Sequence, residues 1–189
     1  MSVEIVNLII SYLTVALDVA LLLLLVIFVG SRISSKIKKT YDVLLRKVKP
    51  KVLLLTFLLL FGAVSSSLFY SEIVGYTPCK LCWYQRIFIF SLMVIFGFAV
   101  WKRDYNISGF ASALALPGSS IAGYHIYLQF FKNDLTACSA GSLAVSCGER
   151  YIESISFISI PVMSMSIFLA VILSSIILLD YRENQNISV

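Results

Sequence analysis

Four cysteines are the residues of this sequence with the clearest capacity for chemistry. They form two local pairs, Cys79 with Cys82 and Cys138 with Cys147. A thiolate can attack the sulfur of a disulfide, so that a close pair of cysteines can exchange a disulfide with another protein. The first pair lies in TPCKLCWYQRIFIF, residues 77–90, directly before an apolar run. A redox-type CxxC therefore stands where an apolar helix is expected to begin.

Three kinds of site are compatible with these cysteines. Structural disulfides are one, although a CxxC ring closes a very short loop and constrains the unfolded chain little. A four-cysteine zinc site is another, although the eight residues between Cys138 and Cys147 exceed the usual ligand spacing of roughly two to four residues. The third is thiol–disulfide exchange, which the surroundings of the CxxC favour.

The residues around the CxxC are suited to stabilising a thiolate. Pro78 precedes the pair and the residues after it are expected to start a helix, whose free N–H groups and positive dipole favour an anion. Arg86 follows Cys82 by four residues, which places its positive charge on the same helical face. The alternative for Arg86 is an interfacial arginine whose charged end reaches the lipid headgroups.

The composition indicates a membrane protein. Hydrophobic residues make up 59% of the chain and charged residues 13%, compared with about half and about a quarter in soluble domains. Five apolar segments are long enough to cross a bilayer, and they are continuous rather than alternating, which favours helices over barrel strands. They run over residues 5–29, 52–70, 84–101, 107–128 and 157–179. The fold class predicted from the residues is an all-α membrane protein.

The distribution of positive charge predicts the orientation of these helices. Eight of the fifteen lysines and arginines lie in residues 31–51, so this stretch is predicted to be cytoplasmic and the N-terminus to lie outside. Alternation of the spans then places eleven of the fifteen on the inner side and all four cysteines on the outer face. Disulfides persist in an outer compartment of this kind.

The basic stretch 31–51 also carries apolar residues at helical spacing. It is predicted either to form an amphipathic helix on anionic lipid or to be a solvated linker that fixes the topology. Since orientation and lipid already account for its charge, no nucleic-acid partner is predicted. The first apolar segment is expected to remain as a membrane anchor, because it is too long for a signal-peptide core and no basic residue precedes it. Asp18, near its middle, is expensive in a bilayer unless it is paired or protonated.

Three motifs resemble the disulfide-bond formation protein B family, which comprises DsbB and its BdbC relatives. They are PCKLCWYQR at 78–86, GYHIYLQ at 123–129, and CGER at 147–150 followed by a last helix that contains Pro161. The resemblance covers about residues 50–182. CxLCxxQR is more specific than a bare CxxC, because it also fixes the position of the arginine.

The resemblance implies a four-helix transmembrane bundle of DsbB type over residues 52–182. Residues 1–30 are then one extra N-terminal transmembrane helix, to which the resemblance assigns no role. Residues 31–51 form the cytoplasmic linker and residues 183–189 a cytoplasmic tail. The short loop between Cys138 and Cys147 resembles the BdbC type.

The resemblance further implies a membrane thiol:quinone oxidoreductase of the cell membrane. Such a protein reoxidises an extracytoplasmic thioredoxin-fold thiol oxidase, DsbA-like, and passes the electrons to a membrane quinone, ubiquinone or menaquinone. By resemblance, Cys138 is the cysteine that the partner attacks, starting from a Cys138–Cys147 disulfide. Cys147 then attacks Cys79 in the Cys79–Cys82 disulfide and leaves Cys82 as the thiolate that faces the quinone. No metal is implied.

Arg86, Gln85 and His125 are the quinone-binding residues that the resemblance implies. The cation of Arg86 can stabilise negative charge on a quinone oxygen. His125, the single histidine, can donate a hydrogen bond or proton, or can be an interfacial polar group. Gln85 can contact the quinone ring or cap local backbone.

Two other classes of protein remain as alternatives. One is an enzyme of the vitamin K epoxide reductase type, in which the quinone-side CxxC follows the loop cysteines, whereas here it precedes them. The other is a non-catalytic membrane protein with structural disulfides or a bound metal.

Overall fold

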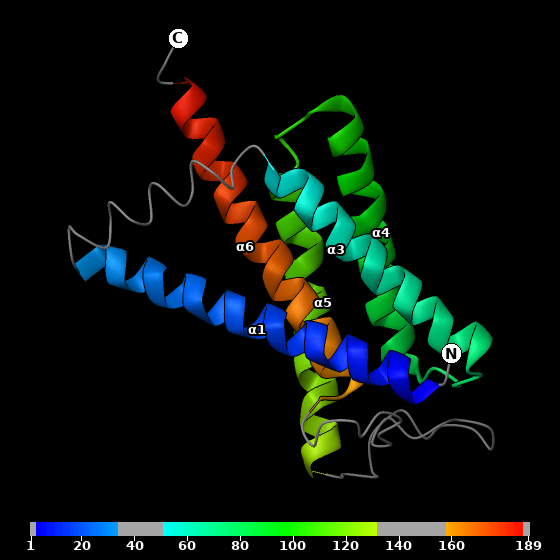
Figure 1. The fold of residues 1–189 in the computed structure, drawn as a ribbon. Helices are drawn as coiled ribbons and strands as arrows, with labels where there is room; N and C mark the ends of the chain where they lie inside the picture. The colour runs from blue at the N-terminus through cyan, green and yellow to red at the C-terminus, as the bar shows by residue number, and fades with distance from the viewer. Residues whose placement is uncertain (1–2, 34–50, 132–157, 187–189) are drawn as a thin grey trace.

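Helices account for most of the chain that the structure describes. The computed structural model describes residues 3–33, 51–131 and 158–186 (Figure 1). The helices are α1 (Val3–Ile33), α3 (Val52–Leu68), the π-helix η2 (Phe69–Ile73) that continues α3, α4 (Lys80–Lys102), α5 (Ser108–Phe131) and α6 (Ile160–Asn186). Cys138, Cys147 and most of the basic stretch 31–51 lie outside the described residues.

All five predicted apolar segments form helices, so the all-α prediction is confirmed. Among the described residues, four helical stretches are long and apolar enough to cross a membrane. They are Val3–Gly30, Val52–Ile73, Lys80–Lys102 and Ile160–Leu179. Helix α5 has 24 residues, contains Pro117 and carries several serines and glycines and the histidine, and it is not among these four stretches. That α5 also spans the bilayer stays a prediction.

Helices α3, α4, α5 and α6 pack together as a bundle, with α5 against α6, α3 against α4, α4 against α5, and α3 against α6 (Figure 1). Their most deeply buried side chains include Leu60, Leu92, Phe96, Phe168, Val171 and Leu178. Gly118 on α5 meets Phe168 on α6 so closely that a Cβ there would lie 2.4 Å from the Cε1 atom of Phe168. A missing side chain thus allows the two helices to approach, as is common between membrane helices.

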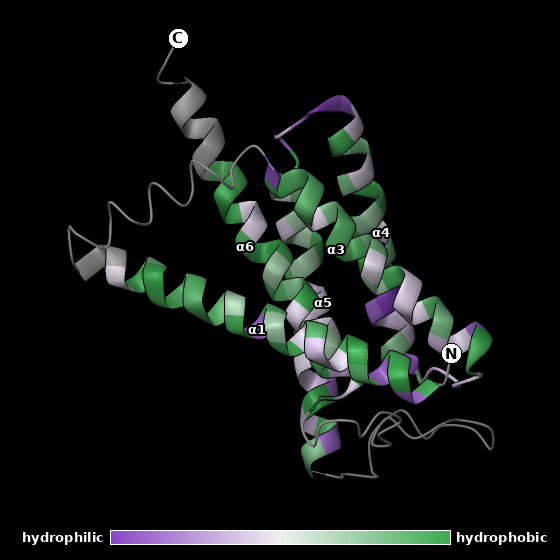
Figure 2. Cartoon of the chain, viewed as in Figure 1, coloured by the Kyte–Doolittle hydropathy of each residue, from purple (hydrophilic) through white to green (hydrophobic). Residues whose placement is uncertain are grey.

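The outer surface of the bundle is apolar along much of its length (Figure 2). Large hydrophobic side chains such as Phe61, Phe98 and Trp101 are more than half exposed. Lipid tails are as apolar as these side chains, so their exposure costs nothing in a bilayer. Hydrophilic residues gather instead at the connection between α4 and α5 (Figure 2).

The two ends of the bundle differ in what they carry. At one end α4 stops at Arg103, which adopts the left-handed conformation (φ 52°) and whose N–H donates to the carbonyls of Ala99 and Val100. At the other end the start of α4 and the end of α5 come together (Figure 1). The fold therefore brings the CxxC region and the GYHIYLQ segment to the same end of the bundle.

Helix α1 crosses the bundle obliquely and packs mainly on α6 (Figure 1). Its apolar stretch of 28 residues would be about 42 Å long at 1.5 Å per residue. This exceeds a hydrocarbon core of about 30 Å, and tilting is the usual way to accommodate such a length. Asp18 is half-buried near its middle.

Candidate redox site and adjoining cavity

Cys79 is the N-cap of α4, as the sequence context predicts. Its backbone is extended (φ −69°, ψ 170°), and its Sγ accepts a hydrogen bond from the backbone N–H of Cys82 at 3.5 Å. The first turn of a helix has N–H groups without intrahelical partners, and an anion there is favoured by the helix dipole. The Cys79 sulfur occupies this position.

The two thiols of the CxxC lie within hydrogen-bonding distance of each other. Both cysteines are free, and their Sγ atoms are 3.2 Å apart. Cys79 is buried, whereas Cys82 is partly exposed. The described geometry is thus that of the reduced pair.

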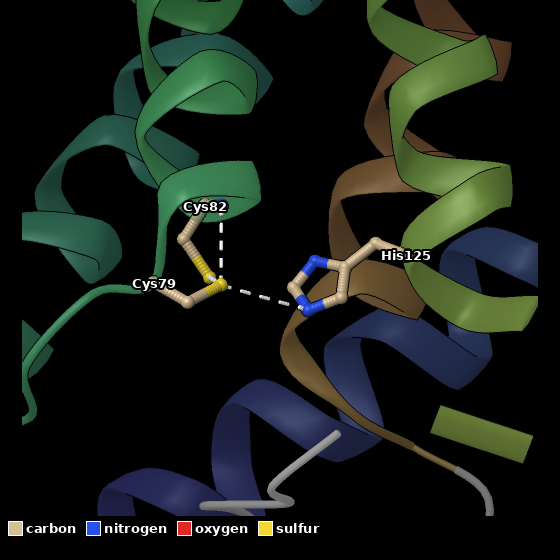
Figure 3. A group of neighbouring side chains, drawn as sticks. All are labelled: Cys79, Cys82 and His125. Atoms are coloured by element: carbon tan, nitrogen blue, oxygen red, sulfur yellow. Dashed lines mark hydrogen bonds between the residues drawn. The ribbon is translucent and has the colours of Figure 1, made fainter. Parts of the chain in front are cut away.

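His125 reaches this pair from α5 (Figure 3). Its Nε2 atom lies 3.8 Å from the Sγ atom of Cys79, and its Nδ1 atom lies 3.1 Å from the side-chain nitrogen of Gln85. An amide nitrogen can only donate, so Nδ1 accepts this hydrogen bond and the proton of the neutral ring lies on Nε2. His125 therefore presents a donor to the Cys79 sulfur.

These contacts lower the pKa of the Cys79 thiol to about 4. The largest cause is the side-chain hydrogen bond with Cys82, and burial opposes it. The hydrogen bond and the electrostatic effect of His125, followed by the backbone N–H of Cys82, lower the pKa further. In the reduced pair these contacts favour the thiolate form of Cys79.

Arg86 is held by the last turn of α3. Its Nε donates to the Ser67 hydroxyl and its Nη2 to the Ser67 carbonyl, both at 2.8 Å. Its guanidinium also lies over the ring of Trp83, 5.5 Å from the centroid. Helix α3 passes into the π-helix at Phe69, two residues after Ser67. This change of winding interrupts the regular backbone hydrogen bonding there. Arg86 is a fixed cation rather than a free interfacial side chain.

A cavity of about 390 Å³ adjoins the CxxC, a volume within the usual range for small-molecule sites. Cys82, Gln85 and Arg86 line it, whereas Cys79 and His125 lie behind Gln85 and Cys82, outside its lining. Its remaining walls come from α1, α3, α6 and the loop before Cys79, and they are mainly apolar. The reactive thiol nearest the cavity is therefore Cys82.

Tyr70 is a cavity residue that the sequence analysis did not select. It lies in the π-helix, is 6% exposed, and its ring stacks on that of Tyr76 with centroids 5.9 Å apart. Its hydroxyl and the Oε1 atom of Gln85 are buried without a hydrogen-bond partner among the described residues. Both residues line the cavity. A π-turn cannot be foreseen from one sequence, so no local signal identified Tyr70.

The structure thus brings together five of the seven predicted site residues. Cys79, Cys82, Gln85, Arg86 and His125 share one end of the bundle. Cys138 and Cys147 lie outside the described residues, and their placement stays a prediction.

Fold and site together define a multi-pass helical membrane protein with a thiol pair beside an apolar cavity. Residues 49–178 match the family model described as "Disulfide bond formation protein DsbB". The chain belongs to the DsbB family.

Three curated relatives agree with this membership. The "SPbeta prophage-derived disulfide bond formation protein B" of Bacillus subtilis (strain 168) is 40% identical over 123 residues, which cover 65% of this chain and 81% of the relative. The "Probable disulfide formation protein C 2" of Bacillus anthracis is 40% identical over 113 residues, covering 59% and 79%. The "Probable disulfide formation protein" of Oceanobacillus iheyensis is 37% identical over 145 residues, covering 71% and 93%. No solved structure matches the chain.

Proposed function

We propose that this protein is a membrane thiol:quinone oxidoreductase. It reoxidises a DsbA-like thioredoxin-fold thiol oxidase outside the cytoplasm and passes the electrons to a membrane quinone. One observation carries the proposal: the thiol of Cys82 borders an apolar cavity that also contains a fixed cation and two unpaired oxygen atoms. Membership of the DsbB family supports disulfide formation as the outcome.

The cavity suits a quinone, which has an apolar body and two polar oxygens. A quinone supplies an acceptor for two electrons and two protons. The Tyr70 hydroxyl can donate to a carbonyl oxygen, and Gln85 Oε1 can accept from a hydroxyl after reduction. The guanidinium of Arg86 favours negative charge on an oxygen nearby. Ubiquinone and menaquinone share these groups, so both fit the chemistry.

Thiol–disulfide exchange links the CxxC to the partner. A partner thiolate attacks Cys138 of a Cys138–Cys147 disulfide, and the released Cys147 thiolate attacks Cys79 and displaces Cys82. The second thiol of the partner then attacks the partner's sulfur in the mixed disulfide with Cys138. This forms a disulfide within the partner and releases Cys138 as a thiolate. Cys138 attacks Cys147, restores the starting disulfide and displaces Cys79. The partner has lost two electrons, and Cys79 and Cys82 have gained them.

The low pKa of Cys79 assists the last exchange. A thiol with a low pKa leaves a disulfide more readily, and His125 and the backbone N–H of Cys82 lower the pKa of Cys79 whatever the charge of the Cys82 side chain. While Cys79 is bonded to Cys147 it cannot share a proton with Cys82. In that state Cys82, with Arg86 one turn away, is the free thiolate next to the cavity.

The proposed location is the cell membrane, with the N-terminus and the cysteines outside and the C-terminus in the cytoplasm. Four helical stretches long enough to span a bilayer and the basic residues of 31–51 support it. In this arrangement residues 1–30 are an additional span, 52–182 the DsbB-like bundle and 183–189 a cytoplasmic tail.

Purified protein tests the function directly. Mixed with a quinone and a reduced thioredoxin-fold oxidase, it should oxidise the oxidase and reduce the quinone in equal amounts. Cys82→Ser should abolish quinone reduction, and Arg86→Met should slow it without unfolding the bundle. Lys102→Met is the matched control, because Lys102 lies at the opposite end of α4. Full activity of Cys82→Ser would contradict the mechanism.

Tyr70→Phe tests the quinone contact by removing a single hydroxyl. Loss of one hydrogen bond, worth about 0.5–1.5 kcal/mol, should raise the KM for quinone by about two- to tenfold. Tyr84→Phe, on a ring that is 52% exposed, should have no effect. An equal KM for quinone in the unsubstituted protein, Tyr70→Phe and Tyr84→Phe would show that Tyr70 does not contact the quinone.

A metal site is the second candidate, because the ligand atoms of Cys79, Cys82 and His125 lie within 4.8 Å of one another. Two thiolates bound to one tetrahedral zinc would be about 3.7 Å apart, given Zn–S bonds of about 2.3 Å. The observed 3.2 Å is shorter and suits a thiol–thiolate hydrogen bond. Stoichiometric zinc in the purified protein, lost in Cys79→Ser, would instead support the metal site.

A further inference from the structure

Helix α1 lies wholly outside the residues that match the DsbB family, since the match begins at residue 49. It nevertheless packs on the bundle, chiefly on α6. Family membership therefore gives no account of what this helix does.

Among the side chains of α1 that the structure describes, the buried ones lie in its N-terminal half. Ser11 is fully buried and Thr14 is 8% exposed, whereas Leu22, beyond them, is 62% exposed. Small side chains allow close approach between membrane helices. The Thr14 hydroxyl donates to the Ile10 carbonyl of its own helix at 2.9 Å, whereas the Ser11 hydroxyl is buried without a hydrogen-bond partner among the described residues. The oblique crossing carries the second half of α1 away from the other helices (Figure 1).

The N-terminal half of α1 is a wall of the cavity beside Cys82. Ile10, Leu13, Thr14 and Leu17 line it, and their spacing of three, one and three residues places them on one helical face. The eight residues from Ile10 to Leu17 extend about 10 Å along the cavity at 1.5 Å per step. The other walls come from α3, α4, α6 and the loop before Cys79.

The cavity lining is polar at one end and apolar at the other. Most of its polar side chains lie on the elements around the CxxC: Ser66, Ser67, Tyr70, Tyr76, Thr77, Gln85 and Arg86. Thr14 on α1 and Ser164 near the start of α6 are further polar lining residues. Leu59 lies two turns from Ser67 on α3, Ile89 lies one turn from Gln85 on α4, and both are apolar. On the proposed function, the quinone ring belongs at the polar end, so the apolar end takes the first part of its isoprenoid tail.

We propose that α1 is a selectivity wall for the quinone, with Leu17 and its neighbours on α1 in contact with the isoprenoid tail. This inference rests on the proposed function and adds a substrate-discriminating element that the family match does not contain. The α1 wall limits which tails the cavity admits, because it replaces mobile lipid with fixed side chains on one side.

Binding to a protein that cannot turn over gives the test. In a Cys79→Ser, Cys82→Ser background, quinone affinity is measured by quenching of tryptophan fluorescence. Two quinones with the same ring are compared, one with a long isoprenoid tail and one without a tail. Leu17→Phe overfills the wall and should raise the Kd of the tailed quinone by about tenfold, with little change for the tail-free one. Leu22→Phe, on the lipid-facing side of α1, is the matched control and should change neither.

A second test uses a substitution that adds no bulk to the cavity wall, so its result does not depend on overpacking. Thr14→Cys in the same background, with Cys138 and Cys147 also replaced by serine, places a single thiol in the wall. The tailed quinone at ten times its Kd should slow alkylation of that thiol by a membrane-soluble maleimide about tenfold. Leu22→Cys should be alkylated at the same rate with and without quinone.

The outcomes separate this inference from the proposed function. Failure of the parent protein to bind either quinone would refute the proposed function. Binding that Leu17→Phe does not weaken, together with no protection of Thr14→Cys, would refute the α1 wall alone. Equal weakening of both quinones by Leu17→Phe would also refute it, because the contact would then be to the ring.

Discussion

In the fully reduced protein, Cys79 should titrate near pH 4 rather than near its ordinary value of 9.0. Its Sγ atom has the Cys82 thiol at 3.2 Å, the Cys82 backbone N–H at 3.5 Å and His125 Nε2 at 3.8 Å. At neutral pH Cys79 should therefore be mainly thiolate.

Two substitutions divide this effect between its causes. Cys82→Ala removes the largest cause and should raise the pKa of Cys79 most, while His125→Phe removes a smaller one and should raise it less. The rate of alkylation by iodoacetamide as a function of pH reports the thiolate, in a background with Cys138 and Cys147 replaced by serine. Tyr124→Phe, next to His125 on α5 but 47% exposed, should leave the titration unchanged.

The same pKa predicts how stability depends on pH. A thiol whose pKa is lower in the folded state stabilises that state fully above its unfolded pKa, near 9.0. This contribution declines as the pH falls and is lost below about 4. A titration near pH 9 that neither Cys82→Ala nor His125→Phe shifts would refute the reasoning, since it would leave the observed contacts without effect.

Packing between the helices gives two further predictions. Gly118→Ala should destabilise the bundle by about 1–3 kcal/mol through overpacking, because its Cβ would meet Phe168 at 2.4 Å. Gly123→Ala on the same helix has nothing within 4 Å and should be neutral or slightly stabilising, and thermal unfolding in detergent compares the two. Thr56→Val breaks a buried 2.8 Å hydrogen bond between the hydroxyls of Thr56 and Ser174 and should cost about 0.6 kcal/mol, typical of such bonds in membrane proteins. An unchanged midpoint for Gly118→Ala, or a loss of several kcal/mol for Thr56→Val, would contradict the packing described.

The structure gives the two CxxC thiols different surroundings, which suit them to different steps of the exchange scheme implied by resemblance. Cys79 is buried, has a lowered pKa and contacts His125, while Cys82 borders the cavity. One thiol is therefore suited to leave a disulfide and the other to face the bilayer carrier. The sequence places both at a helix start but does not distinguish them in this way.

The sequence by itself determined the helices and the position of the thiol pair. Five apolar runs predicted five helices, because apolar segments of this length satisfy their own backbone in lipid. Pro78 before the CxxC and the apolar run after it predicted a helix start there, and Cys79 is indeed its N-cap. Capping and hydropathy are local properties, so a single sequence reveals them.

Only the tertiary structure decided which side chains meet. His125 contacts Cys79 from 46 residues away, Arg86 is fixed by Ser67 on α3, and Tyr70 and α1 complete the cavity. These helices are apolar on all sides, because they face lipid as well as protein, so hydropathy does not indicate which face turns inward. Packing sets that rotation, through contacts such as Gly118 with Phe168, and with it the residues that surround the thiols.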